Sequence, residues 1–308
     1  MRRFRRRTIF IVAGITAAIY IGVSIYAFTN LRFPRLGILS FLFLLLAAVA
    51  ELGGKWMLGM QFRHGVVEVG SHLSTKSAFR AALVGAGVAR LIPAGGAITP
   101  VAMAWTVRRE APGTGGAAVR STVLHFSGLL IATGIALLWV INRGLYSSLA
   151  AGTAILAVIL ILTGSVLFFG TGWLGSVSKR LPPRIRDLLG HTAANHAPDL
   201  PSQGWLWGRV ALESAAVYLV MQAMGIPLTP SQVISAFGIS QLAGGLPGTP
   251  GGIGFAEAGL VGALAAYGYP AAFTVAPILI YRIVSYWLPA LGGLVAGGTA
   301  FLREGTRS

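Results

Sequence analysis

Seven ionisable side chains fall in stretches otherwise apolar enough to lie inside a membrane: Glu51, Lys55, Arg90, Arg209, Glu213, Glu257 and Arg282. Each costs about 2.5–3.5 kcal/mol in hydrocarbon unless it is paired or hydrated. Two sets, Glu51 with Lys55 and Arg209 with Glu213, have a spacing of four residues, so each set can meet on one helical face. The bland interpretation of these two pairs is local neutralisation near an interface.

Arg90, Glu257 and Arg282 have no such neighbour in sequence. Two arrangements are open for them. In one, Arg282 and Glu257 form a pair that only locks two helices together. In the other, Arg90 and Arg282 line a polar cavity and hold a phosphate, whose oxygens match the planar guanidinium fork. Glu257 would then bind a cationic headgroup or carry a coupling proton.

Two breaks in the helical pattern lie beside these charges. The first reads LIPAGGAITP over residues 91–100, and the second reads GGLPGTPGGIGFAEAG over residues 244–259. Hydrocarbon tolerates a broken backbone only where protein or a polar cavity covers it, and transporters place their sites there. Half-helix N-termini at such breaks would add N–H groups for an anion. The residues expected to act as gates are Pro93, Gly95, Gly96, Pro247, Pro250, Gly251 and Gly252.

The composition predicts an all-α, polytopic membrane protein. The chain has 308 residues, of which 55% are hydrophobic and 10% charged, against about 25% charged residues in a soluble domain. Its mean hydropathy is +0.75. The absence of cysteine excludes disulfides and thiolate chemistry. The net charge of +16 is typical of basic cytoplasmic loops, and no soluble domain remains to bind nucleic acid.

One integral membrane domain, residues 1–308, is therefore predicted. The sequence begins MRRFRRR, and the apolar run that follows, residues 8–29, is long enough to cross a bilayer with the N-terminus in the cytoplasm. The expected spans are residues 8–29, 36–60, 118–141, 146–170, 204–224 and 271–298. The expected broken hairpins are residues 78–107 and 231–267, and a cytoplasmic loop covers residues 171–203.

The distribution of basic residues favours hairpins that dip into the membrane and return. If both broken segments re-enter, 17 of the 24 Lys and Arg residues face the cytoplasm and three face outward. On this topology the two hairpins enter from opposite sides, both termini are cytoplasmic, and an inverted repeat is expected. Two short full crossings at each break remain the alternative.

Other residues indicate no cofactor or metal. His191 and His196 match no metal-ligand spacing and suit a solvated loop, whereas His125 suits a hydrogen-bonded histidine of the core. The glycine-rich break lacks the GxxxxGK[ST] pattern of a nucleotide loop, and no nucleophile–base pair is evident. An enzymatic function is therefore not expected.

The segment from Gly225 to Gly293 resembles the lysylphosphatidylglycerol synthase transmembrane family, a flippase-like domain. The resemblance rests on PGTPGGIGFAE with its acid, Glu257, and on the Tyr-Arg-x3-Tyr-Trp-x-Pro run that begins at Tyr281. It implies that Tyr281 and Tyr286 join Arg90, Glu257 and Arg282 as lipid-binding residues. The N-terminal half departs from the family, because PAGGAITPVAMAW lacks the usual Glu and Arg and the next helix, VLHFSGLL, lacks an acid–base pair. The synthase domain is also absent from this sequence.

These features predict a bacterial cytoplasmic-membrane protein that moves a lipid with a phosphate headgroup between leaflets. An anionic or headgroup-modified phospholipid and a polyprenyl-phosphate-linked sugar both fit, and a separate lipid-modifying enzyme would be a partner. The alternative is a scaffold that docks such a glycosyltransferase or synthase through residues 171–203. A membrane-embedded lipid transferase is a third interpretation. The sequence leaves the oligomeric state open.

Overall fold

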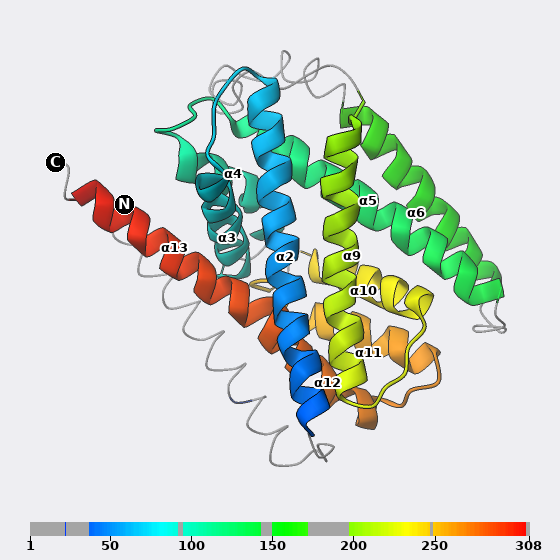
Figure 1. Cartoon of the computed structure of the whole chain (residues 1–308). Helices are drawn as coiled ribbons and strands as arrows, with labels where there is room; N and C mark the ends of the chain where they lie inside the picture. Colours follow the sequence, from blue (N-terminus) through cyan, green and yellow to red (C-terminus); the bar gives the residue numbers. More distant parts are fainter. Residues whose placement is uncertain are drawn as a thin grey trace.

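The computed structural model describes residue 22 and residues 37–91, 95–142, 150–171, 197–246 and 249–305. This part of the chain is a bundle of helices, as the sequence predicts (Figure 1). The predicted first span, residues 8–29, lies outside the described residues except for residue 22. The helices are α2 (Ile38–Glu68), α3 (Thr75–Leu91), α4 (Gly95–Val107), α5 (Gly115–Asn142), α6 (Ala150–Gly170), α9 (Leu200–Ala223), α10 (Pro230–Gly244), α11 (Phe255–Ala266), α12 (Ala271–Arg282), the π-helical turn η2 (Ile283–Trp287) and α13 (Leu288–Gly305).

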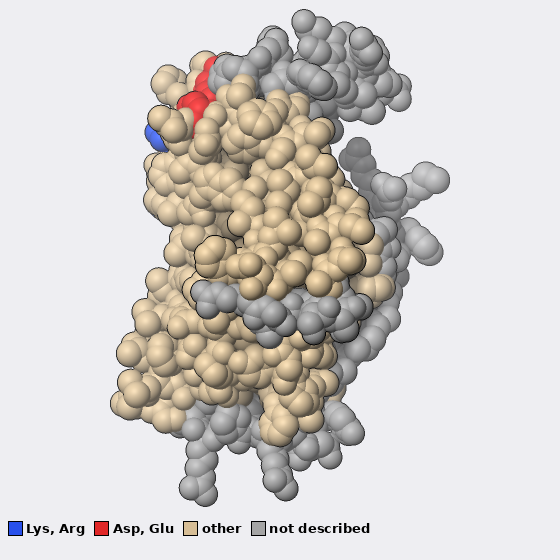
Figure 2. Space-filling model, turned by 90° about the vertical axis from the view of Figure 1, so that its right-hand side faces the viewer, with Lys and Arg blue, Asp and Glu red and all other residues tan. Residues whose placement is uncertain are grey.

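Four helical segments of the described chain are long and apolar enough to cross a membrane: α2, α5, α6 and the continuous run from Ala271 to Gly297. Their outer surfaces are apolar, and large side chains such as Phe41, Leu162 and Phe169 are exposed. Figure 2 shows one face of the molecule on which the described charged residues gather at one end only. This surface suits contact with lipid tails.

Both predicted breaks separate two helices that pack against each other. The first predicted break, residues 91–100, contains the end of α3 and the start of α4, so residues 95–100 are helical and Pro100 lies inside α4, contrary to the prediction; the second contains the end of α10 and the start of α11. These four helices contain 17, 13, 15 and 12 residues, so each is shorter than the roughly 20 residues needed to cross the hydrocarbon. Figure 1 shows α3 and α4 in the upper half of the view and α10 and α11 in the lower half. Their entry from opposite membrane sides stays a prediction.

Local sequence explains where α9 and α10 begin. Asp199 accepts a hydrogen bond from Ser202 N at 3.0 Å and caps α9. Thr229 and Gln232 form a reciprocal capping box at the start of α10. Pro230 stands at its first position, where a missing N–H costs nothing. The second hairpin therefore has a sharply defined entry.

The two largest of the four apolar clusters in the described residues form most of the core. The first joins α2, α5, α9, α10, α11 and α12 and includes Val217, Phe237, Leu264 and Ile278. The second joins the C-terminal half of α2 to α3, α4 and the start of α5 and includes Phe62. Each hairpin thus packs into its own cluster, and α2 belongs to both.

The structure differs from the sequence-based expectations at two helices. Helix α2 continues through Glu68, eight residues beyond the predicted end at residue 60, because its last turns are held by contacts to other helices. The final predicted span, residues 271–298, contains Pro277 and the π-helical turn. Of the predicted loop 171–203, residues 172–196 lie outside the described part.

Candidate functional site

The second break has a backbone that requires glycine. Gly251, Gly252 and Gly254 have φ angles of 58°, 70° and 86°, which side chains with a Cβ rarely adopt. A Cβ on Gly251 would lie 2.3 Å from the Tyr286 ring, and one on Gly252 would lie 2.3 Å from the Gly244 oxygen. The turn is therefore pressed against both its own hairpin and the last membrane helix.

Glu257 fastens this turn to the last helix. Its Oε2 accepts a hydrogen bond from Gly254 N at 2.7 Å, and its Oε1 lies 2.6 Å from Arg282 Nε. Arg282 Nη2 also donates to the Gly251 oxygen at 3.2 Å. The carboxylate thus caps α11 at its positive end and pairs with a buried arginine.

Arg90 fastens the first hairpin to the same helix. Its Nε donates to the Ser285 oxygen at 3.1 Å, and its Nη1 donates to the Ala86 oxygen at 2.8 Å. The Tyr286 hydroxyl donates in return to the Arg90 main-chain oxygen. Ser285 and Tyr286 belong to the π-helical turn, a type of irregularity that is frequent at functional sites. Both breaks therefore converge on residues 282–286.

The two pairs with four-residue spacing form and join into one buried network between α2 and α9. Lys55 Nζ lies 2.8 Å from Glu51 and 2.6 Å from Glu213 Oε1, and Arg209 Nε lies 3.0 Å from the same Glu213 oxygen. Arg90 Nη2 lies 3.7 Å from Glu51 Oε1, which places Arg90 beside Lys55. The charges predicted as two local pairs are thus one network that reaches the first break.

A cavity of about 450 Å³ lies where the two breaks and this network meet. Such a volume suits a headgroup-sized ligand. Its charged lining residues are all basic within the described part of the chain: Lys55, Arg90, Arg209 and Arg282. The breaks and their flanks contribute Gly96, Ala97, Thr99, Gly244, Gly245, Thr249, Gly251 and Gly252.

The sequence-predicted residues divide among several places. Arg90, Arg282 and Tyr286 line the cavity, as do the predicted gate residues Gly96, Gly251 and Gly252. Glu257 lies behind the lining, bonded to Arg282, and Tyr281 is buried in the first apolar cluster. Gly95 begins α4, and Pro250 lies in the turn before Gly251. Pro93 and Pro247 lie outside the described residues.

Sequence reasoning did not place Lys55, Arg209 and His125 at the site. His125 was expected to be a hydrogen-bonded core histidine, but its Nδ1 is buried without a hydrogen-bond partner among the described residues. Its Nε2 lies 3.6 Å from Glu213 Oε2. The available signal is that the apolar parts of α2 and α9 each hold an acid and a base four residues apart, which is costly unless these charges are used together.

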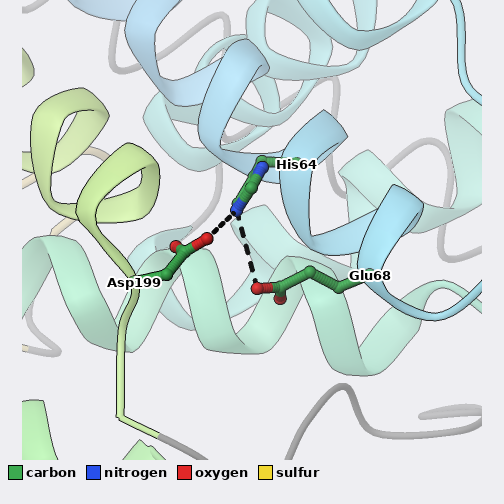
Figure 3. Close-up of side chains that lie close together, drawn as sticks. All are labelled: His64, Glu68 and Asp199. Carbon is green, nitrogen blue, oxygen red and sulfur yellow. Dashed lines mark hydrogen bonds and ion pairs between the residues drawn. The ribbon is translucent and has the colours of Figure 1, made fainter.

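A second polar cluster joins the end of α2 to the start of α9 (Figure 3). His64 Nε2 lies 2.8 Å from Asp199 Oδ2 and 3.5 Å from Glu68 Oε1. Each residue offers one atom that could bind a metal ion, and these atoms lie within 4.8 Å of one another. Arg120 also donates to Glu68. These hydrogen bonds and ion pairs already explain the cluster as a clasp between helices.

The electrostatic effect of this clasp is clearest in the pKa of Asp199. Burial opposes ionisation of its carboxyl group, but hydrogen bonds from Ser202 and His64 outweigh burial and lower the pKa of Asp199 below its ordinary value. The Asp199 side chain is 37% exposed, so solvent screens its ion pair with His64. The clasp is thus a weaker electrostatic feature than the buried cavity network.

Comparison with known protein families gives a match over nearly the whole chain. The family model for the lysylphosphatidylglycerol synthase TM region matches residues 7–293. A UPF0104 membrane protein of Methanothermobacter thermautotrophicus is 30% identical over 131 residues, which are 39% of this chain and 37% of that protein. The aligned region thus spans little more than a third of the length of this curated relative. By the match over residues 7–293, the chain belongs to the lysylphosphatidylglycerol synthase transmembrane family.

Proposed function

We propose that the protein moves a lipid with an anionic phosphate headgroup between the two leaflets of a bacterial cytoplasmic membrane. The observation that carries the proposal is the basic cavity at which both helix breaks meet. Such a cavity allows a charged headgroup to reside at membrane depth while the lipid tails stay in hydrocarbon. The role is transport, and no covalent step is assigned to the site.

Arg282 and Arg90 would contact the phosphate. Arg282 uses its Nε and Nη2 groups in bonds to Glu257 and Gly251, and a guanidinium has five N–H donors in total. Donors therefore remain for a phosphate oxygen. Charge-assisted bonds of this kind are about twice as strong as neutral ones.

The two breaks would act as the gates of the cavity. The second turn is attached to Arg282 through Gly251 and Glu257, and the first hairpin is attached to the π-helical turn through Arg90. A phosphate on the remaining donors of Arg282 places a second negative charge close to Glu257, and this repulsion weakens the attachment of the second turn. Headgroup binding would thereby be coupled to movement of a hairpin, with both termini on the cytoplasmic side.

Transport by the purified full chain in proteoliposomes tests this function. Movement of fluorescent phosphatidylglycerol between leaflets is followed by quenching from outside. Arg282→Ala should reduce the rate by at least about tenfold, because an arginine–phosphate contact is lost. Arg109→Ala, a change at an exposed arginine outside the cavity, should leave the rate within about twofold. A folded Arg282→Ala protein that transports at the original rate would refute the proposal.

A further inference from the structure

We infer that the cavity selects a headgroup with one net negative charge and no ammonium group, and that Lys55, Arg209 and His125 form a second wall that binds it. This inference rests on the proposed function, because it names the lipid class that the same cavity would carry. It also excludes aminoacylated lipids, whose ammonium groups need a carboxylate.

Each carboxylate near the cavity is paired with a cation, while Glu213 Oε2 has no hydrogen-bond partner in the described structure and lies 3.6 Å from His125 Nε2. Glu257 binds Arg282 and the Gly254 N–H through different oxygens. Glu213 Oε1 receives both Lys55 and Arg209, and Glu51 lies between Lys55 and Arg90. No carboxylate is among the described residues that line the cavity. An ammonium group that entered would therefore meet no carboxylate at the cavity surface, where every charged lining residue that the structure describes is a cation.

The charges of the described cavity network do not cancel. Four cations, at Lys55, Arg90, Arg209 and Arg282, face three carboxylates, at Glu51, Glu213 and Glu257, which leaves one positive charge in excess. A buried excess charge is costly unless a counter-charge accompanies it. One phosphodiester supplies a single negative charge. A phosphodiester that also carries an ammonium group supplies none.

His125 provides an independent sign of a missing ligand. It lines the cavity, is 5% exposed, and its Nδ1 has no hydrogen-bond partner in the described structure. A buried polar atom needs a partner, which can be an ordered water, an ion or a ligand. Its neighbours Lys55 and Arg209 come from two other helices, and both line the same cavity. A phosphate oxygen at this wall would bind the two cations and satisfy the histidine.

Calorimetric titration of the purified full chain in detergent tests the inference. The probes are dioctanoyl phosphatidylglycerol, dioctanoyl phosphatidylethanolamine, the lysine ester of the first, and inorganic phosphate. Phosphatidylglycerol should bind at least about tenfold more tightly than its lysine ester. The added positive charge of the ester is repelled by the cations of the cavity, and this repulsion is strong in a low dielectric. Equal or tighter binding of the lysine ester would overturn the inference. Inorganic phosphate that binds as tightly as phosphatidylglycerol would show a soluble-anion site instead of a lipid site and would also overturn it.

Matched substitutions at Arg209 examine the second wall. Arg209→Gln removes the excess charge but keeps the Lys55–Glu213 pair, so it should weaken phosphatidylglycerol binding about tenfold and narrow the preference over the lysine ester. Arg209→Lys keeps the charge and should retain the preference. If Arg209→Gln does not fold, His125→Leu, which removes the unsatisfied ring nitrogen, should weaken phosphatidylglycerol binding. Unchanged binding in the folded variant would exclude this wall from the site.

The outcomes separate this inference from the proposed function. If phosphatidylglycerol is preferred but Arg282→Ala transports normally, the transport proposal fails and the headgroup selection stands. If transport depends on Arg282 while the lysine ester binds equally well, the selection fails and the transport proposal stands.

Discussion

The two helical hairpins reach the same cavity but are fastened to it by different chemistry. The second hairpin uses a carboxylate, Glu257, which caps its own helix and pairs with Arg282. The first hairpin has no acid in its described residues and uses Arg90, whose guanidinium binds main-chain oxygens. Both attachments end on residues 282–286, around the π-helical turn. One irregular turn of the last helix thus serves as a common anchor for both breaks.

This difference shows that the first hairpin is held in position without an acid of its own. The first break reads PAGGAITP and keeps only proline and glycine. Its contact with the anchor needs only the Arg90 side chain and the Tyr286 hydroxyl. The second break depends on a buried ion pair and on left-handed glycines. The second attachment should therefore be the more sensitive of the two to substitution.

The largest expected effect is that of Glu257→Ala. It leaves Arg282 buried without its carboxylate and removes the cap of α11, so we expect a loss of about 3–5 kcal/mol in the free energy of unfolding. Denaturation in detergent measures it. Glu110→Ala, at an exposed acid that accepts a hydrogen bond from Ser74 N, should cost less than about 1 kcal/mol. Equal losses in both variants would contradict the special role of the buried pair.

Alanine substitutions distinguish the two breaks directly. Gly251→Ala puts a Cβ 2.3 Å from the Tyr286 ring at a φ of 58°, so it should cost about 1–3 kcal/mol. Gly96→Ala at the start of α4 meets nothing closer than Phe126 at 3.9 Å and should be neutral or stabilising by up to about 1 kcal/mol. Unfolding midpoints of the two variants give the comparison. A reversed order would show that the first break is the more constrained.

Tyr286→Phe should loosen the first hairpin alone. It removes the hydroxyl bond to the Arg90 oxygen but keeps the ring beside Arg282, at 5.1 Å from the guanidinium carbon to the ring centre. A loss of about 1 kcal/mol is expected. Hydrogen exchange should accelerate at residues 86–91 and stay unchanged at residues 255–260. Acceleration at both hairpins would mean that their attachments are not separate.

The smallest effect is expected at the clasp of Asp199 and His64, which belongs to neither hairpin. The pKa of Asp199 is lowered in the folded protein, so its contribution to stability is complete above the ordinary value of about 3.8 and is lost as the pH falls through the lower folded value. Asp199→Asn should remove that acid-range dependence and change stability at neutral pH by less than about 1 kcal/mol. Unfolding measured from pH 3 to pH 7 checks this prediction. An unchanged pH profile in Asp199→Asn would exclude the clasp as its source.

The sequence predicts the helix breaks and the charged residues better than it predicts the contacts between helices. Proline and glycine fix where the two breaks lie, and the uncompensated charges lead to Arg90, Glu257 and Arg282. The sequence does not predict the contacts between helices, because the partners are distant along the chain. Lys55 and Glu213 are 158 residues apart, and Tyr286 and Arg90 are 196 residues apart. Helical spacing offers each charge a local partner, which hides the contact between helices. The π-helical turn also leaves no clear mark in an otherwise apolar helix.

We expect one cavity to be reached through both breaks, and the absence of cysteine from the sequence allows a direct test. Thr249→Cys places the sole thiol of the protein at the cavity wall in the second break. In proteoliposomes with a known orientation, a membrane-impermeant maleimide is supplied from one side and then from the other. We expect the thiol to be labelled from each side and phosphatidylglycerol to protect it. Labelling from one side only, whatever lipid is present, would contradict it.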